Sequence, residues 1–398
     1  MTTLWQKFRS LFRGDTYVLA AITALVVASV LAVYSSSSVL AYQHGGDGDI
    51  ARVITRHLFM LALGVGFMGC VSRISPRVWY GLSWILLGVA VLLQAATLVV
   101  GTSINGASRW LSVGGISFQP SELSKFFLMI FVARQLSRHY DNPTKAFWFI
   151  AGATALVCML IVLENLSTCI LIVASVWIVM FVARVSMVYL LGSTVIVGGV
   201  LALALLFAPQ LGEMSSRFYR LGTWRARVER YIGGSGAEES AAGNYQAEQA
   251  KAAVCTGGLL FGKGPGNSYM KNFLPMAFSD FIFAIIIEEY GVFPGCVVIL
   301  AAYFVIFARA FFVARHCNKP FRIYLVFGLA LLLTFQALIN MAVGVGLMPV
   351  TGQTLPLVSM GGTSNVCMGI AFGIILSISN EAQQQAVATK TSETKTDK

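Results

Sequence analysis

Long apolar runs separated by short polar gaps constrain this 398-residue chain more than any other feature of its sequence. A helix needs roughly 20 predominantly apolar residues to cross the hydrocarbon core of a bilayer. Only 11% of the residues are charged, against about 25% in soluble domains, so polar groups could not cover a globular surface. The sequence therefore predicts an all-α polytopic membrane protein with about ten transmembrane helices. The predicted spans are 16–39, 53–71, 78–100, 120–136, 146–163, 166–183, 187–208, 281–308, 321–347 and 364–380.

The spans predict one membrane domain, residues 16–380, preceded by a basic cytoplasmic segment at 1–15. Residues 209–280, between the seventh and eighth spans, form a much longer connection, and loops of such length are usually functional. A short helix is predicted within it at 238–254. The polar tail at 381–398 is predicted to be disordered and cytoplasmic.

Basic residues give the orientation. Sixteen Lys and Arg residues lie on the side of the two termini, whereas the short loops opposite hold three, namely Arg52, Arg56 and Arg109. Cytoplasmic loops carry an excess of basic residues, so both termini are predicted to be cytoplasmic and the long loop extracytoplasmic. The net charge of +11 is thus explained by topology and does not indicate a nucleic-acid partner.

Cysteine and histidine spacing gives no sign of a metal centre. The seven cysteines contain no C-x-x-C pair, and the four histidines are scattered, so we expect neither a disulfide framework nor a metal cluster. Gly257–Lys263 reads G-x-x-x-x-G-K, but Gly264 follows where a phosphate-binding loop has Ser or Thr. We interpret this stretch as flexible backbone beside the site.

Asp280 closes the long loop where the eighth span is predicted to begin. Asp280 could be a structural acid, because the macrodipole stabilises an acid at a helix N-terminus. Alternatively, it could be a general base that takes the proton from a sugar hydroxyl. Glu288 lies two turns further, about 12 Å along a helix, too far for the close carboxylate pair of a retaining glycosidase. A single-base transferase therefore fits better than a hydrolase. Acids within a span point to a cavity or to polar partners, and both alternatives remain for Glu288 and Glu289.

A second polar group lies around the fourth predicted span. Pro120 and Glu122 suit the first turn of a helix, but Lys125 lies one turn further, within the apolar run. Glu122 and Lys125 can pair at this spacing, and such pairs usually face a polar interior. Arg109 lies at interface depth, where it would either anchor the chain or bind a phosphate group.

The third group is the apolar but helix-breaking segment 339–365. Irregular backbone at membrane depth occurs where it is buried or lines a cavity. Gly361 and Gly362 precede a predicted helix start. Its free N–H groups could bind an anion, or the segment is only a helix break with N-capping. The complete set of candidate substrate-binding residues is Arg109, Glu122, Lys125, Arg217, Arg220, Lys271, Glu288, Thr351, Ser359, Gly361, Gly362 and Ser364.

Together these segments resemble the SEDS family (shape, elongation, division and sporulation) over nearly the whole chain. The resemblance rests on NGASRW at 105–110, QPSELSK at 119–125, SDFIFA with EE at 279–289, and PVTGQTLPLVSMGGTS at 349–364. The NGASRW wording favours the cell-division branch of the family over its elongation branch.

The resemblance implies a peptidoglycan glycosyltransferase of the bacterial cytoplasmic membrane. Such an enzyme polymerises lipid II, an undecaprenyl-diphosphate-linked disaccharide-pentapeptide, beside a class B penicillin-binding protein and, in this branch, other divisome proteins. By motif position, Asp280 matches the catalytic acid, and Glu122 and Lys125 match a polar pair that lines the central cavity. A divalent cation such as Mg²⁺ could assist, but the sequence shows no dedicated site.

Three positions depart from the family pattern. Met276 and Phe278 replace a Glu and a His near the acidic motif, and LENLST at 163–168 replaces a QPDLGT turn. The polar surroundings of Asp280 are therefore expected to differ from those in the family. Two other functions remain open, a lipid II flippase and a non-catalytic divisome scaffold.

Overall fold

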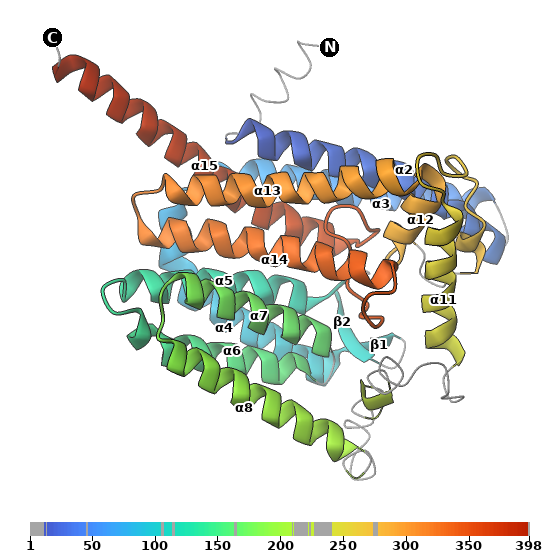
Figure 1. Cartoon of the computed structure of the whole chain (residues 1–398), viewed down its shortest axis with the longest axis horizontal. Coiled ribbons are helices and arrows are strands. Elements are labelled where there is room, and N and C mark those ends of the chain that lie inside the picture. The colour runs from blue at the N-terminus through green and yellow to red at the C-terminus, as the bar shows by residue number, and fades with distance from the viewer. Residues whose placement is uncertain are drawn as a thin grey trace.

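Long helices packed side by side form a bundle (Figure 1). The computed structural model describes residues 12, 14–44, 47–104, 107–113, 116–162, 165–208, 210, 222, 224–226, 241–273 and 278–396. Within this part of the chain, eight helices are long and apolar enough to cross a membrane. The helices of the bundle are α2 (Thr16–His44), α3 (Asp47–Val71), α4 (Pro76–Val100), α5 (Pro120–Arg138), α6 (Phe147–Val162), α7 (Leu166–Val182), α8 (Met187–Leu206), α13 (Val297–Arg315), α14 (Pro320–Gly344) and α15 (Thr363–Thr396).

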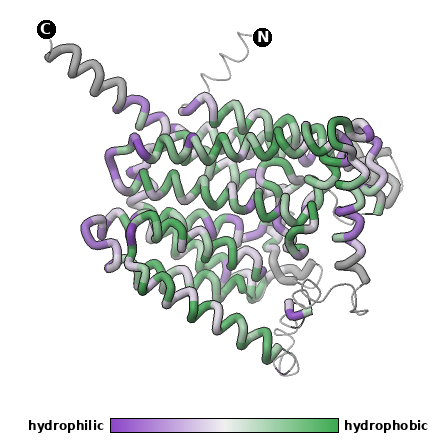
Figure 2. The backbone as a smooth tube through the Cα atoms, viewed as in Figure 1, coloured by the Kyte–Doolittle hydropathy of each residue, from purple (hydrophilic) through white to green (hydrophobic). Residues whose placement is uncertain are grey.

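The prediction of a polytopic helical membrane protein is confirmed. Helices α5 and α7 are not among the eight long apolar helices, because α5 carries several charges and α7 has only 17 residues. Both nevertheless lie within the bundle beside the others (Figure 1). Hydrophobic residues dominate the bodies of the helices, and hydrophilic residues gather mainly at their ends and connections (Figure 2).

Helices α5, α14 and α15 are the most deeply buried of the long helices, whereas α8 lies almost entirely on the outside of the bundle. Small residues let α3 and α15 approach closely. A Cβ atom on Gly64 would lie 2.6 Å from the Asn365 carbonyl oxygen, and one on Gly369 would overlap the Gly64 carbonyl. Backbone contact of this kind is typical of packed membrane helices. It fixes the start of α15, which follows the candidate segment 349–364.

The eighth predicted span, 281–308, is broken, and the prediction of one continuous helix there is wrong. A nine-residue helix, α12 (Ile282–Tyr290), ends at Gly291, which adopts a φ of 95°. A π-helical turn, η4 (Val292–Cys296), then leads into α13. Glycine reaches this left-handed region without steric cost, so the change of direction occurs there. Glu288 and Glu289 consequently lie at a corner before the membrane-spanning helix.

A small sheet that the sequence analysis did not predict precedes α5. Strands β1 (Thr102–Ile104), β2 (Ala107–Val113) and β3 (Ile116–Phe118) pair antiparallel in the order β1-β2-β3. The register pairs Thr102 with Trp110 and Leu111 with Phe118. Turn-forming pairs lie between the strands, Asn105-Gly106 and Gly114-Gly115, and such pairs between apolar runs are a hairpin signal.

The long connection between α8 and α12 holds one helix and one short turn in its described part. Helix α11 (Ala241–Thr256) corresponds to the helix predicted at 238–254, and a 3₁₀ turn, η3 (Met270–Asn272), lies beyond it. A second 3₁₀ turn, η1 (Pro143–Ala146), precedes α6. The sheet, α11 and α12 lie at the same end of the bundle (Figure 1), which we call the site end.

Helix α15 continues to Thr396, so the prediction of a disordered tail is wrong for 381–396. The segment is rich in Ala, Gln, Glu and Lys, which favour helix. At the opposite end of the bundle from the site, Ser377 donates to the Ile74 carbonyl oxygen (2.6 Å), and Arg322 pairs with Glu381. These bonds fix the part of α15 from which the helix extends.

Candidate functional site

Asp280 lies just before α12 at the site end, half-buried. The Ser279 hydroxyl donates a hydrogen bond to Asp280 Oδ1 (3.0 Å). An acid at the start of a helix is favoured by the macrodipole, so the local sequence alone accounts for a charged group here. Its partial exposure leaves the carboxylate accessible from outside the bundle.

Asn340 on α14 fixes the main chain of Asp280. Its side-chain Nδ2 donates to the Asp280 carbonyl oxygen (2.9 Å) and to the Gln353 carbonyl oxygen (2.6 Å). Gln353 in turn donates to the Thr168 hydroxyl at the start of α7 (2.8 Å). Asn340 is fully buried, and sequence reasoning missed it, although an Asn inside an apolar span was a usable signal.

Ser359 provides the second support. Its hydroxyl donates to the Ser279 carbonyl oxygen (2.5 Å) and accepts from the Leu355 N–H (2.8 Å). The Met360 N–H donates to the Phe278 carbonyl oxygen (2.9 Å). The predicted candidate Ser359 therefore acts on the main chain beside Asp280, and residues 278 and 279 are held by the irregular segment that follows α14.

That irregular segment, residues 345–362, is buried in its second half, from Leu355 to Ser359, whereas Leu347 and Met348 are exposed. Ser29 on α2 donates to the Val358 carbonyl oxygen (2.9 Å), and its hydroxyl also contacts His57 Nε2 on α3 (3.0 Å). The Tyr303 hydroxyl on α13 donates to the Pro356 carbonyl oxygen. Buried carbonyl groups outside regular structure need such partners, and here the side chains of Ser29 and Tyr303 supply them from two different helices.

Glu122 and Lys125 form the predicted ion pair, with Nζ and Oε2 2.8 Å apart. Lys125 is 1% exposed, and its Nζ also donates to Gln336 Oε1 on α14 (2.5 Å). Ser364, at the start of α15, donates to Glu122 Oε2 (3.1 Å). The structure thus contains the predicted pair of Glu122 and Lys125, and it adds Ser364, which was not predicted to contact them.

Glu288 belongs to a different network. It is fully buried and accepts from Lys263 Nζ (2.7 Å), from the Ser268 hydroxyl (2.5 Å) and from the Tyr269 N–H (3.1 Å). These partners belong to the loop between α11 and η3, so the structure does not bring Glu288 to Asp280. Lys263, the lysine of the G-x-x-x-x-G-K stretch, is occupied by this ion pair.

Lys271 and Glu289 fasten the same corner to α2. Lys271 Nζ donates to the carbonyl oxygens of Ser35 (3.2 Å) and Gly266 (2.8 Å), and the Ser35 hydroxyl donates to Glu289. Burial raises the pKa of Glu289 above its ordinary value, and the charge of Lys271 partly offsets this. The predicted candidate Lys271 is therefore buried in a structural contact.

The remaining candidates are placed as follows. Gly361 and Gly362 precede α15, with Gly362 at a φ of 51°, which confirms the predicted helix start. The Thr351 hydroxyl is buried with no hydrogen-bond partner in the described part of the chain. Arg109 lies in β2, while Arg217, Arg220 and Met276 fall outside the described residues. Among the described residues, no group of three or more His, Cys, Asp or Glu could hold a metal ion.

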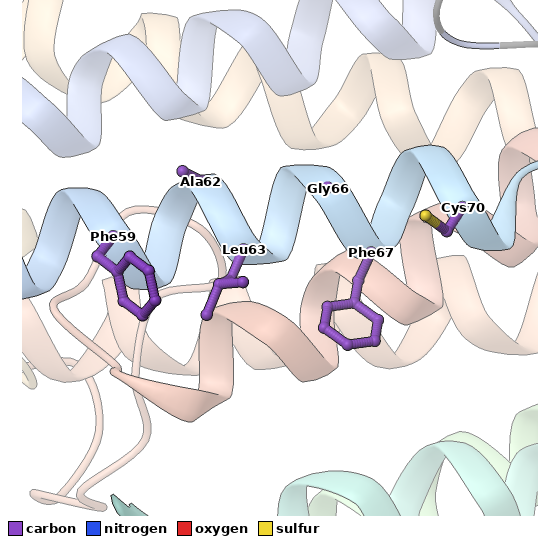
Figure 3. Close-up of a pocket in the computed structure, with 6 residues that line it drawn as sticks. All are labelled: Phe59, Ala62, Leu63, Gly66, Phe67 and Cys70. Atoms are coloured by element: carbon purple, nitrogen blue, oxygen red, sulfur yellow. The ribbon is translucent and has the colours of Figure 1, made fainter.

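An apolar cavity of about 340 Å³ lies along α3, apart from these polar groups. Figure 3 shows its lining side chains along one stretch of that helix. They are Phe59, Ala62, Leu63, Gly66, Phe67 and Cys70. Its chemistry suits hydrocarbon and offers nothing to a sugar or a diphosphate.

The sequence was compared with known families and proteins. The FtsW/RodA/SpoVE model, described as a cell cycle protein, matches residues 15–384. A probable peptidoglycan glycosyltransferase FtsW of Aliivibrio salmonicida is 32% identical over 350 residues, which cover 84% of this chain and 82% of the relative. The peptidoglycan glycosyltransferase MrdB of Escherichia coli is 30% identical over 380 residues, covering 94% and 95%.

Solved structures share the fold. One similar chain comes from a structure described as the structural coordination of polymerization and crosslinking by a peptidoglycan synthase complex. Its TM-score is 0.72 and its sequence identity 26%, and the match covers 93% of this chain and 99% of that chain. It is also similar to the rod shape determining protein RodA of Thermus thermophilus, with a TM-score of 0.64, 26% identity, and 92% and 96% coverage.

Proposed function

Because the chain belongs to the FtsW/RodA/SpoVE family and is a peptidoglycan glycosyltransferase, we propose that it polymerises lipid II at the outer face of the cytoplasmic membrane. The observation that carries the proposal is the setting of Asp280. This half-buried carboxylate lies at the site end, on main chain fixed by Asn340 and Ser359. A catalytic group held in this way keeps its position during the reaction.

In the proposed step, Asp280 is the general base. It takes the proton from the 4-hydroxyl of a bound precursor while that oxygen attacks the anomeric carbon at the lipid-linked end of the growing chain. The new glycosidic C–O bond forms as the bond between the anomeric carbon and the diphosphate oxygen breaks, so the anomeric configuration inverts. Lipid diphosphate leaves with the bonding electron pair. Proton removal by a positioned carboxylate contributes typically 10²–10⁴-fold to a rate, an order-of-magnitude figure.

The leaving diphosphate needs positive charge, and the described contacts favour some candidates over others. The ammonium of Lys125 is already paired with Glu122, and Lys271 is used by backbone carbonyls. We therefore assign the diphosphate to Arg109, whose strand lies at the site end, and to Arg217 and Arg220. Arginine suits this role because its planar fork matches phosphate oxygens.

The proposed setting is bacterial cell division, with both termini in the cytoplasm. The orientation rests on the excess of basic residues on the side of the termini, and the branch on the NGASRW segment. The related chain solved in work on a peptidoglycan synthase complex supports a partner, which we propose to be a class B penicillin-binding protein that crosslinks the strands.

The test compares glycan polymerisation from purified lipid II by wild type, Asp280→Asn and Asp141→Asn, each with the cognate partner. Asp141 is exposed in the connection before α6, so its variant controls for loss of one carboxylate. The proposal expects long strands from wild type and Asp141→Asn, and none from a folded Asp280→Asn protein.

Equal polymerisation by all three would make Asp280 only a helix-end acid, and the catalytic assignment would move elsewhere. If even wild type makes no strands, liposomes that contain lipid II separate the other two functions. Translocation without polymerisation would indicate a flippase, and neither activity would indicate a scaffold.

A further inference from the structure

The loop between α11 and η3 presents three consecutive apolar side chains outward. Leu259 is 72% exposed, Leu260 58% and Phe261 88%. The value for Phe261 is the highest among the large hydrophobic residues that the structure describes. We call residues 259–261 the apolar tip.

Main-chain hydrogen bonds clamp the apolar tip onto the corner between α12 and α13. The N–H groups of Val292 and Phe293 donate to the carbonyl oxygens of Gly258 (3.0 Å) and Leu259 (2.9 Å). On the other side of the tip, the N–H groups of Lys263 and Gly264 donate to the carbonyl oxygens of Glu288 and Glu289, both at 2.9 Å. The residues before and after the apolar tip are therefore both fixed to the corner between α12 and α13.

Glycines make this close approach possible. A Cβ atom on Gly262 would overlap the backbone of Glu289, and one on Gly257 would overlap the carbonyl of Ile287. Gly258 adopts a φ of 69°, which favours glycine. The glycines of the G-x-x-x-x-G-K stretch thus allow the loop to pack closely against α12.

The clamp sets the tip at the level where the membrane-spanning helix begins. The apolar span that includes α13 starts at Val292, the residue bonded to Gly258. Phe293 is 60% exposed, and exposed apolar residues continue along α13 with Val298 at 51% and Phe304 at 68%. The tip is thus bonded to the outer end of a helix that carries exposed apolar side chains along its length.

No charge projects from the tip. Lys263, two residues beyond Phe261, turns toward Glu288 and pairs with it. Aromatic and aliphatic side chains at the end of a span are typical of residues that sit at the boundary between headgroups and acyl chains.

From this placement we propose that the apolar tip inserts into the lipid of the outer leaflet and anchors the outer loop to the bilayer surface. A hydrocarbon partner fits this chemistry, because the tip adjoins the exposed apolar surface that runs along α13 through Phe293, Val298 and Phe304. The anchor would hold α12, and with it Asp280, at a fixed depth. The assignment to the outer leaflet follows the orientation proposed above, whereas lipid contact itself does not depend on it.

The test places photoreactive benzoylphenylalanine at position 261 of the full-length protein in nanodiscs of phosphatidylethanolamine and phosphatidylglycerol. Irradiation followed by mass spectrometry should give phospholipid adducts on the acyl chains, at a yield close to that of the same group at Phe304. The same group at Tyr269, an aromatic residue of the same loop with 59% exposure, serves as the matched position away from the tip.

A lipid yield at 261 no higher than at Tyr269 would overturn the proposal. So would irradiation with the cognate partner present if the adducts at 261 moved from lipid to that protein, which would make the tip a protein-docking surface. If the photoreactive protein does not fold, the conservative variant Phe261→Trp in bilayers with brominated acyl chains replaces it. Excess fluorescence quenching over wild type supports insertion, and equal quenching contradicts it. None of these readouts depends on glycosyltransferase activity.

Discussion

Gln336 and Asn340 lie one turn apart on α14 and bind the same irregular segment. Gln336 Nε2 donates to the Thr354 carbonyl oxygen (3.0 Å), and Asn340 Nδ2 donates to that of Gln353 (2.6 Å). Each side chain has a second partner, Lys125 for Gln336 and the Asp280 main chain for Asn340. One face of α14 therefore joins the buried ion pair to the proposed base, with a rise of about 6 Å between the two amides.

Replacing Asn340 with Ala should lower polymerisation by roughly tenfold or more, because two buried carbonyl groups lose a donor and the Asp280 main chain loses a support. Tenfold corresponds to about 1.4 kcal/mol, within the range for one or two hydrogen bonds. Rates with purified lipid II measure it. Leu338→Ala, on an exposed position of the same helix, is the matched control and should keep wild-type rates. Equal losses in both variants would point to general damage to α14.

Replacing Lys125 with Met should destabilise the protein strongly, because the buried Glu122 would lose its counter-ion inside the bundle. Breaking one partner out of a buried pair costs about 3–5 kcal/mol. The double variant Glu122→Gln with Lys125→Met removes both charges and should recover much of that loss. Thermal unfolding in detergent compares the three proteins. A double variant no more stable than the single one would show that the charges are not what the bundle needs.

Replacing Gly64 with Ala should lower the unfolding midpoint, because the new methyl group would press against the Asn365 carbonyl oxygen at 2.6 Å. Overpacking typically costs about 1–3 kcal/mol, and a backbone contact leaves little room to relax. Gly66 is two residues away on the same helix, with nothing within 4 Å of an added Cβ, so Gly66→Ala should have a midpoint close to that of wild type. Equal unfolding midpoints for Gly64→Ala and Gly66→Ala would contradict the close contact between α3 and α15.

The buried acid Glu289 should make stability depend on pH. Burial raises its pKa above the ordinary 4.5, so the folded state binds its proton more tightly than the unfolded state. Its contribution to stability is complete below 4.5 and is lost as pH rises through the raised value. The Gln side chain of Glu289→Gln stays neutral and keeps an acceptor for Ser35. The melting temperature of this variant minus that of wild type should therefore increase as pH rises. Glu248→Gln, exposed on α11, should show no such gain, and a pH-independent difference for Glu289→Gln would contradict the argument.

Much of the fold could be predicted from the sequence because lipid imposes a simple rule on length and hydropathy. The broken eighth span escaped prediction because 281–308 is predominantly apolar apart from Glu288 and Glu289, and hydropathy does not register a change of direction at Gly291. The small sheet escaped because its strands are shorter than the apolar runs on either side. Residues 381–396 were assigned to disorder from their polarity, although their composition also favours helix.

The site was predictable where side chains pair locally. Glu122 and Lys125 are three residues apart, and their partnership follows from helix geometry. Gln336 and Asn340 were not found, because a single amide in an apolar span does not reveal which distant carbonyl it meets. Glu288 was predicted to bind substrate because a carboxylate inside an apolar run stands out in the sequence. Its partners Lys263 and Ser268, however, lie in a loop whose path the sequence does not reveal.

The order in which the site can be assembled follows from the supports of Asp280. The main chain of Asp280 depends on Asn340, and the adjoining Ser279 carbonyl depends on Ser359. Asn340 and Ser359 are both synthesised well after Asp280. A nascent chain that stops before α14 has already inserted most of its spans, yet it lacks both supports. The proposed site would therefore be complete only once α14 and the segment that follows it have been made, which would delay activity until synthesis of the bundle is nearly finished.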